Sequence, residues 1–462
     1  MASEAPLPCR KPERDIALAT DLYQLTMGAG YAALDLAGPA TFSLFVRRLP
    51  ADRSFLVVAG LSEALARLRG LRFEPEDLAY LRTLPQVRPD FIERLAGFRF
   101  HGDVWAVPEG RTVFADEPIL EVQATILEAQ LVETALVNAL HFPITVATKA
   151  ARCVIAAPGR SLVDFGLRRT PGIEAGLSVA RSCYLAGFDA TSNLMAGARY
   201  GIPVSGTVAH SFVEAFPTEL DAFRAFATVY PGPVTLLIDT YDSLRGAEHA
   251  VVVARELAAR GGRLAAVRID SGDLAALSVG VRRILDAAGL DGVQIVASGG
   301  LDEFALAELA ALGAPIDAYG VGTRVGTAAD APTLDMAYKL VDYDGVPRLK
   351  LSEGKRTLVG AKQVWRRRDA EGRFVGDVIA GRDDASPGPA WEPLLEPVMR
   401  AGTALPEPDL SAIRARHHAE VAALPAQLLR LRGTGAYPVT LSPDLARRQA
   451  LAEAATRQRE GC

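Results

Sequence analysis

A histidine in a glycine-containing segment is the first residue here whose type and setting suggest chemistry. His210 belongs to the segment GTVAHS at 206–211, which follows an extended run at 202–205 and precedes a helix-like run at 212–216. A strand that delivers a histidine before a helix is typical of the C-terminal face of an α/β barrel. Histidine changes charge near neutral pH and is a competent nucleophile. The alternative is a structural histidine that hydrogen-bonds at the start of a helix.

Glycine-rich turns follow two later apolar runs. One turn reads Ser298-Gly299-Gly300, and the other reads GVGT at 320–323. Backbone N–H groups beside such glycines can approach an anion, and the loops after the last two strands of a barrel are a recurrent phosphate site. Tight turns between strands and helices are the alternative explanation.

Charged side chains follow other strand-like runs. Arg268 lies within an apolar run, where an unpaired charge is costly, so we expect it to be functional. An arginine side chain can bind a carboxylate or a phosphate in a bidentate manner. Arg168 and Arg169 offer the same kind of binding as Arg268. Four carboxylates can hold Mg²⁺ through oxygen ligands, and they are Asp239, Asp242, Asp270 and Asp273. The alternative for Asp270 or Ser271 is that the side chain caps a helix. Together these residues predict a site for a phosphorylated, anionic substrate, and both phosphoryl and glycosyl transfer fit it.

The elements that must position these residues alternate between strand and helix. Short apolar runs are expected as strands at 161–165, 203–206, 234–238, 264–269, 293–297 and 316–319, with a further short one at 187–191. A spacing of about 25–35 residues per unit is typical of βαβ units in a parallel sheet. The number of units favours a barrel over an open sheet.

The flanking segments have a different pattern. Strand-rich residues at 100–123 precede a helix over 126–139 that we expect to end near Pro143, and antiparallel strands return past 335 with a hairpin turn at Asp344-Gly345. His417-His418 is expected to be a surface feature. The expected organisation is a disordered tail at 1–14, an α+β domain at 15–145, a catalytic βα barrel at 146–335 and a C-terminal segment at 336–462 that packs on the N-terminal domain.

Composition argues against several classes of protein. The chain has 462 residues and a formal net charge of −5, whereas general nucleic-acid binders are usually basic. Its four cysteines are far apart, so neither a zinc knuckle nor a disulfide framework is indicated. The N-terminus lacks the apolar stretch of a signal peptide, and no apolar run approaches transmembrane length. We therefore expect a cytoplasmic protein that binds neither nucleic acid nor membrane.

The chain resembles the nicotinate phosphoribosyltransferases over nearly its whole length. The resemblance rests on the order and spacing of short motifs, which are TDLYQ (20–24), FGLRR (165–169), GFDATSN (187–193), GTVAHS (206–211), DTYD (239–242), RIDSGD (268–273), GVGT (320–323) and YKL (338–340). It implies an α/β fold, the irregular βα barrel of type II phosphoribosyltransferases, with an α+β domain built from both chain ends. It also implies a homodimer with active sites at the subunit interface.

The resemblance further implies an activity. Nicotinate and phosphoribosyl pyrophosphate would give nicotinate mononucleotide and pyrophosphate in NAD biosynthesis, with coupled ATP hydrolysis and Mg²⁺. The phosphorylated histidine of the family falls on His210. The nicotinate contacts fall on Tyr23, Thr207 and Arg268, with Phe165 as the expected stacking partner. A phosphoribosyl pyrophosphate contact falls on Thr323, and the same role is expected for Arg168, Asp270, Ser298, Gly299, Gly300 and Gly322. The expected metal ligands are Asp239 and Asp270.

Two alternatives stay open at this point. One is a phosphoribosyltransferase for nicotinamide or quinolinate. A nicotinamide enzyme has no substrate carboxylate for Arg268 to neutralise, and a quinolinate enzyme needs no phosphorylatable histidine. The other is a non-catalytic barrel that only binds a phosphorylated metabolite. The turn Ser298-Gly299-Gly300 also departs from the Ser-Asn or Ser-Gly pair of many relatives, which leaves the phosphate contacts there open.

Overall fold

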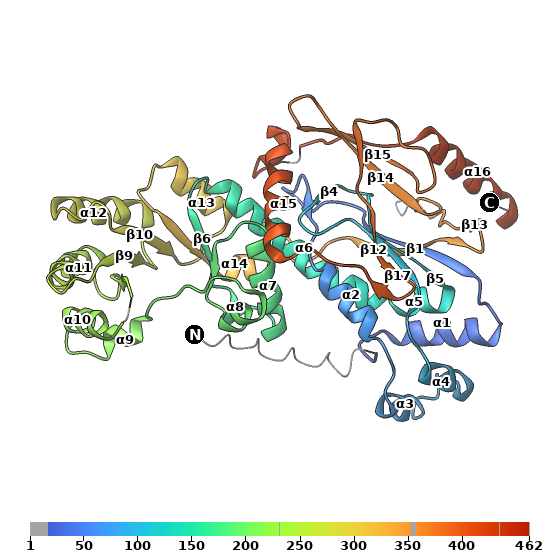
Figure 1. The fold of residues 1–462 in the computed structure, drawn as a ribbon, viewed down its shortest axis with the longest axis horizontal. Coiled ribbons are helices and arrows are strands. Elements are labelled where there is room, and N and C mark those ends of the chain that lie inside the picture. The colour runs from blue at the N-terminus through green and yellow to red at the C-terminus, as the bar shows by residue number, and fades with distance from the viewer. Residues whose placement is uncertain (1–16, 231, 353–356, 434, 462) are drawn as a thin grey trace. The chain divides into compact units, whose positions relative to one another are not determined.

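The chain divides into two compact units (Figure 1). The computed structural model describes residues 17–230, 232–352, 357–433 and 435–461. The central unit comprises Thr145–Pro332, and the end unit comprises Met1–Ile144 together with Thr333–Cys462. The boundary between them falls inside helix α6 (Glu133–Ala156). The tail expected at 1–14 lies outside the described residues.

A parallel sheet forms the centre of the central unit. Its strand order is β7-β6-β11-β10-β9-β8, and every neighbouring pair is parallel. The strands are β6 (Ser161–Asp164), β7 (Ala190–Thr191), β8 (Val234–Leu237), β9 (Leu264–Ile269), β10 (Gln294–Ser298) and β11 (Ala318–Val321). The sheet curls into part of a barrel, so the prediction of an irregular βα barrel is confirmed.

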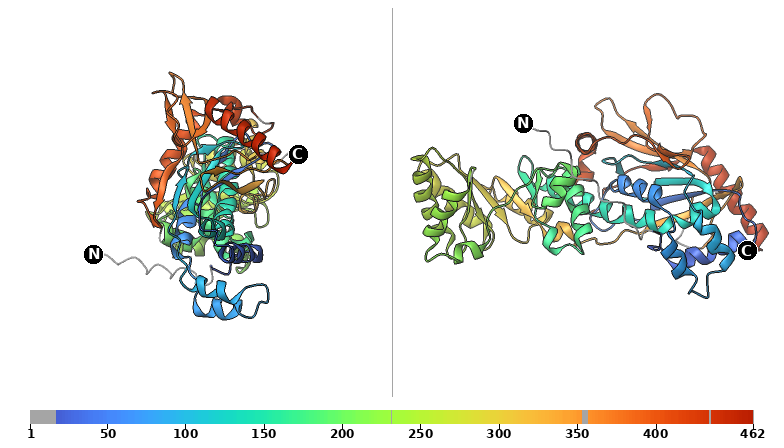
Figure 2. Two further views of the ribbon diagram at one scale, coloured as in Figure 1. Left: turned by 90° about the vertical axis from the view of Figure 1, so that its right-hand side faces the viewer. Right: turned by 60° about the horizontal axis from the view of Figure 1, so that its bottom comes forward.

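The helices of the central unit connect these strands. They are α7 (Ile173–Leu185), α8 (Leu194–Tyr200), α9 (His210–Glu214), α10 (Glu219–Val229), α11 (Ser243–Ala258), α12 (Leu274–Ala287), α13 (Glu303–Ala311) and α14 (Thr323–Gly326), with a 3₁₀ turn at Leu167–Arg169. Helices α10, α11 and α12 stand side by side (Figures 1 and 2). Side chains that cap α11, α12 and α13 lie within a few residues of the preceding strand, which places those strand-to-helix loops at the carboxyl edge of the sheet.

The strand expected at 203–206 is absent from the described residues. A single parallel bridge between Thr191 and Val204 stands in its place. Pro203 has no N–H group to donate to a neighbouring strand, and residues 203–206 are exposed, so neither hydrogen bonding nor burial extends the pairing. His210 consequently follows a loop and is the first residue of the short helix α9.

Strands from both chain ends build the end unit. One sheet has the order β13-β12-β1-β5-β3-β17-β18, and a second has the order β16-β14-β15-β19. In chain order these strands are β1 (Pro39–Val46), β3 (Asp103–Ala106), β5 (Pro118–Thr125), β12 (Met336–Tyr343), β13 (Val346–Pro347), β14 (Lys362–Arg368), β15 (Phe374–Gly381), β16 (Trp391–Pro393), β17 (Glu396–Arg400), β18 (Thr403–Ala404) and β19 (Val439–Leu441). Strand β1 pairs with both β5 and β12, which confirms an α+β architecture made from both chain ends.

Helices complete the end unit. They are α1 (Leu22–Ala33), α2 (Leu61–Gly70), α3 (Pro75–Leu81), α4 (Pro89–Ala96), α5 (Ile126–Leu131), α15 (Leu410–Ala423) and α16 (Pro443–Glu460), with a 3₁₀ turn at Ala426–Leu429 and a small ladder of β2 (Leu56–Val57) with β4 (Thr112–Val113). The predicted hairpin turn is confirmed, because Tyr343 pairs with Val346 around Asp344 and Gly345. No helix in the described part of the chain is both long and apolar enough to span a bilayer.

The expectation that a helix ends near Pro143 is wrong. Helix α6 continues through Pro143 to Ala156. A proline inside a helix costs about 3 kcal/mol. Leu136, Leu140 and Ile144 on either side of it are fully buried, and each such side chain contributes about 1.5–3 kcal/mol. Burial of this face therefore outweighs the lost hydrogen bond.

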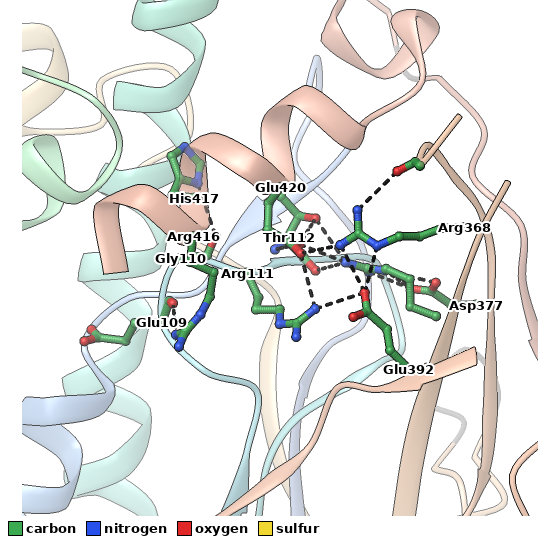
Figure 3. A network of polar contacts seen from close by, with 12 residues as sticks. Glu109, Gly110, Arg111, Thr112, Arg368, Asp377, Glu392, Arg416, His417 and Glu420 are labelled. Carbon is green, nitrogen blue, oxygen red and sulfur yellow. Dashed lines mark hydrogen bonds and ion pairs between the residues drawn. The ribbon is translucent and has the colours of Figure 1, made fainter. Parts of the chain in front are cut away.

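A buried ionic network joins distant segments of the end unit (Figure 3). Arg366 is fully buried on β14, and its Nη2 lies 2.6 Å from Asp377 Oδ2. Its Nη1 lies 2.9 Å from the Thr112 carbonyl oxygen and 3.1 Å from Glu420 Oε2. Because Glu420 belongs to α15, the network ties that helix to β14, β15 and the start of β4.

One expectation for the same helix is wrong. His417 is buried, and its Nδ1 lies 3.2 Å from the Gly110 carbonyl oxygen (Figure 3). The neighbouring His418 is exposed. Burial lowers the pKa of His417 to about 4, so the ring is neutral at neutral pH. Only His418 is the surface residue that the sequence led us to expect.

Substitution of Arg366 should destabilise the end unit. We expect Arg366→Met to lower its free energy of unfolding by about 3 kcal/mol, because two buried carboxylates lose a partner. Chemical denaturation followed by tryptophan fluorescence measures this unit, since Trp105, Trp365 and Trp391 all lie within it. The exposed neighbour Arg367 is the control, and Arg367→Met should change stability by about 0.5 kcal/mol or less. Equal effects of the two substitutions would contradict the prediction.

Candidate active site

Arg268 is the centre of a cluster at the carboxyl edge of the parallel sheet. Its side chain projects from β9 and is 14% exposed. Nη1 lies 2.7 Å from Thr207 Oγ1, and Nε lies 3.1 Å from Ser298 Oγ. Nη2 lies 3.3 Å from Asp270 Oδ1, which also accepts a short hydrogen bond from the Ser298 hydroxyl. The structure thus brings together four of the residues predicted to form the site.

Phe165 adds an aromatic face to this cluster. The Arg268 guanidinium carbon lies 5.8 Å from the centroid of the Phe165 ring, within the range of a cation–π contact. Gly320 makes room for the ring, because a Cβ atom on Gly320 would lie 2.3 Å from it. The sequence suggested that this glycine admits an anion, whereas its contact is with Phe165.

The loop after β10 combines a structural glycine with an open one. A Cβ atom on Gly299 would lie 2.0 Å from the Asp270 carbonyl oxygen, and the backbone there has a positive φ of 97°. Among the described residues, apart from Gly300 and its two chain neighbours, no atom lies within 4 Å of the corresponding position on Gly300. Gly299 is therefore required for the loop to pass the end of β9, and Gly300 borders open space that an anion can enter.

Asp239 and Asp270, the expected metal ligands, are linked through the backbone. Asp239 Oδ2 accepts hydrogen bonds from the Asp270 N–H at 2.9 Å and the Ser271 hydroxyl at 2.7 Å. Asp239 Oδ1 is buried and has no hydrogen-bond partner among the described residues. Within that part of the chain, no group of three or more His, Cys, Asp or Glu side chains is placed to hold a metal ion. Asp242 and Asp273 cap helices α11 and α12, so capping falls on these residues and not on Asp270 or Ser271.

His210 lies next to the loop that follows β8. Its Nδ1 lies 3.2 Å from Thr240 Oγ1, and its side chain is partly exposed. A neutral imidazole has one donor and one acceptor nitrogen, so a hydroxyl at Nδ1 can fix the ring while Nε2 remains for chemistry. We did not predict a role for Thr240. The available signal was its position in the DTYD motif, directly after Asp239.

Asp164 is a second residue of the site that sequence reasoning missed. Its Oδ1 accepts a hydrogen bond from the Gly166 N–H, and its Oδ2 accepts one from the Thr191 hydroxyl, both at 2.7 Å. Burial raises the pKa of this carboxyl group. Asp164 thereby joins the ends of β6 and β7 and fixes the loop that carries Phe165.

Three further predicted residues belong to other elements. Arg168 is exposed in the turn Leu167–Arg169, and Thr323 is exposed at the start of α14 next to Gly322. Tyr23 belongs to the end unit, where it is 48% exposed on helix α1. Partial burial and the nearby Glu133 carboxylate raise the pKa of Tyr23, so its phenol is protonated at neutral pH.

Solved structures share this architecture. The nicotinate-nucleotide pyrophosphorylase of Pyrococcus furiosus matches with a TM-score of 0.73 at 24% identity, covering 89% of this chain and 97% of its own. Human nicotinic acid phosphoribosyltransferase matches with a TM-score of 0.85 at 32% identity, covering 94% and 99%. The fold is therefore that of a type II phosphoribosyltransferase.

Sequence comparisons define the family within this class. Models of the N-terminal and C-terminal domains of nicotinate phosphoribosyltransferase match residues 18–141 and 388–449. The nicotinate phosphoribosyltransferase pncB2 of Mycobacterium tuberculosis is 49% identical, covering 92% of this chain and 91% of that protein. The human nicotinate phosphoribosyltransferase is 34% identical, covering 93% and 95%. The chain belongs to the nicotinate phosphoribosyltransferase family.

Proposed function

We propose that this enzyme transfers the phosphoribosyl group of phosphoribosyl pyrophosphate to nicotinate in the cytoplasm, with coupled ATP hydrolysis. The products are nicotinate mononucleotide, a precursor in NAD biosynthesis, and pyrophosphate. The observation that carries the proposal is the Arg268 guanidinium beside the Phe165 ring. A planar ring that bears a carboxylate matches an aromatic face next to a nearly buried cation.

The glycosyl step needs positioning more than proton transfer. The pyridine nitrogen attacks C1 of the ribose as the bond to pyrophosphate breaks, so the nucleophile is supplied by the substrate. Arg268 and Thr207 bind the carboxylate, and Phe165 stacks on the ring. These contacts hold the nitrogen in line with C1, and catalysis follows from orientation and charge stabilisation.

The glycine loops bind the phosphate groups in this scheme. Gly299, Gly300 and Gly322 present backbone N–H groups, while Thr323 adds its hydroxyl and the start of helix α14. Arg168 supplies an exposed positive charge at the same edge of the sheet. Asp270 contacts the phosphoribosyl group from the end of β9.

Asp239 and Asp270 fit a Mg²⁺ ion that also binds substrate phosphates. Mg²⁺ in such sites is held by one or two carboxylates, with phosphate oxygens and water completing its shell. The buried, unpaired Oδ1 of Asp239 supports this assignment. When bound, Mg²⁺ neutralises the charge that develops on the leaving pyrophosphate.

ATP acts through His210 in this proposal. The unprotonated imidazole attacks the γ-phosphorus of ATP, the bond to the β-phosphate oxygen breaks and ADP leaves, while the Thr240 hydroxyl beside Nδ1 holds the ring during transfer. The phosphorylated enzyme then favours productive binding of the other substrates, and water finally hydrolyses the phosphohistidine to release inorganic phosphate. The histidine is outside the glycosyl step, because the pyridine nitrogen needs no general base.

A homodimer completes the proposed enzyme. Tyr23 would contact nicotinate in the site of the neighbouring subunit, for which an exposed aromatic side chain on α1 is suited. Sedimentation at assay concentration tests this, since a fully active monomer would exclude it.

Pyrophosphate release distinguishes the proposal from its alternatives. We expect release with nicotinate, stimulation by ATP, and far slower release with nicotinamide or quinolinate. A quinolinate enzyme would show no ATP stimulation, and a nicotinamide enzyme would prefer the uncharged ring. Binding of phosphoribosyl pyrophosphate without release for any of the three acceptors would identify a non-catalytic protein.

A further inference from the structure

A buried lysine of the central unit contacts the two segments that follow the glycine loops. Lys149 of α6 is fully buried, and its Nζ lies 2.6 Å from Glu303 Oε2 and 2.5 Å from Asp330 Oδ1. Arg152, three residues further along the same helix, places its Nε 3.0 Å from Glu303 Oε1. Two cations from α6 thus face two carboxylates from segments far away in the sequence.

The two carboxylates follow the two loops in question. Glu303 is the first residue of α13, directly after Asp302, and Asp302 lies two residues past Gly300. Asp330 follows helix α14, which begins at Thr323 next to Gly322. A single ammonium group therefore connects the segment after the β10 loop with the segment after the β11 loop.

A second ion pair links the same two loops on their exposed side. Arg324 Nη1 lies 3.3 Å from Asp302 Oδ2, and the Arg324 side chain is 55% exposed. Exposed pairs contribute little to stability, whereas a buried charge that loses its partner is costly. Lys149 is therefore the stronger of the two constraints on the relative position of the loops.

We propose that Lys149 is a positioning residue that sets the spacing of the two glycine loops for the pyrophosphate group of the substrate. The inference rests on the proposed function, because it assigns phosphate binding to these loops. A buried ion pair is weak evidence for stability, since apolar residues would fill the same space at least as well. What this pair provides is a fixed distance between two backbone segments.

Lys149→Met tests the inference against a matched control. Lys362 of the end unit is also buried, with Nζ 3.0 Å from the buried Glu121, so Lys362→Met removes a comparable pair outside these loops. By titration calorimetry, we expect Lys149→Met to weaken binding of phosphoribosyl pyrophosphate by about tenfold or more, because small displacements of binding groups are costly. For Lys362→Met the dissociation constant should stay within about twofold of the parent. For both variants, the KM for nicotinate at saturating phosphoribosyl pyrophosphate should change little.

Glu303→Gln provides a second variant with almost unchanged shape, which keeps the test decisive if Lys149→Met does not fold. It should also weaken phosphoribosyl pyrophosphate binding, and the double variant should bind about as weakly as Lys149→Met, because the two residues are direct partners in one network and their effects are not additive. Equal binding by Lys149→Met and Lys362→Met, or unchanged binding by Glu303→Gln, would overturn the inference and leave the proposed function intact. A parent enzyme that fails to bind phosphoribosyl pyrophosphate would overturn both.

Discussion

His210→Ala should abolish ATP hydrolysis and ATP stimulation while leaving a slow, ATP-independent synthesis of nicotinate mononucleotide at high phosphoribosyl pyrophosphate. The variant lacks the imidazole proposed to accept phosphate, yet it keeps the Arg268 cluster proposed to orient nicotinate. Product formation and ATP hydrolysis, measured in the same reaction, separate the two roles. Complete loss of the ATP-independent reaction with normal substrate binding would place His210 in the glycosyl step itself.

Radiolabel from γ-labelled ATP identifies the residue that carries the phosphate. A phosphoramidate on histidine is acid-labile and alkali-stable, and we expect this pattern in the parent and no label in His210→Ala. His249 is a suitable control, because it is a partly exposed histidine of the same unit whose Nδ1 lies 2.9 Å from Glu219. His249→Ala should retain the label. Label that persists in His210→Ala would assign the phosphate to another residue.

Arg268→Ala should raise the KM for nicotinate by about two to four orders of magnitude, because loss of one partner of a buried pair costs about 3–5 kcal/mol. The same substitution should reduce the preference for nicotinate over nicotinamide, since only nicotinate has a carboxylate that can pair with Arg268. Steady-state kinetics with both acceptors measure these changes.

Two further arginine variants sharpen this test. Arg268→Lys keeps the charge but not the planar fork that reaches Thr207, Ser298 and Asp270 together, so it should be intermediate. Arg263, exposed just before β9, is the matched control, and Arg263→Ala should behave like the parent. Unchanged nicotinate binding in a folded Arg268→Ala enzyme would exclude the assignment.

Much of the candidate site could be predicted from the sequence. Arg268 stood out as a charge within an apolar run, and Thr207, Asp270 and Ser298 each followed an expected strand or turn. Because the carboxyl ends of parallel strands meet at one edge, Arg268, Asp270 and Ser298 gather there whatever the details of packing. Thr207 reaches the cluster on a loop, in place of the strand expected at 203–206. In the structure, Thr207, Asp270 and Ser298 each lie within hydrogen-bonding distance of Arg268, and Ser298 also contacts Asp270.

The features that could not be predicted depend on contacts between distant segments. Helix α6 continues through Pro143 because its neighbours are buried by elements far away in the chain. His417 is buried because helix α15 lies against Gly110, some three hundred residues earlier. The contact between Gly320 and Phe165 is likewise a matter of side-chain packing across two strands. Local patterns contain no record of such partners.

The insertion of the central unit between two halves of the end unit affects how the chain emerges from the ribosome. Strand β1 is complete by Val46, yet its partner β12 begins only at Met336, with Ala40 opposite Tyr343. At about 5–20 residues per second, synthesis takes roughly 15–60 s to cover that distance. During this interval the apolar β1 edge is available to other nascent chains, and unpaired edges promote aggregation. A polypeptide that stops before Met336 should therefore depend on chaperones, although every strand of the parallel sheet has already been made.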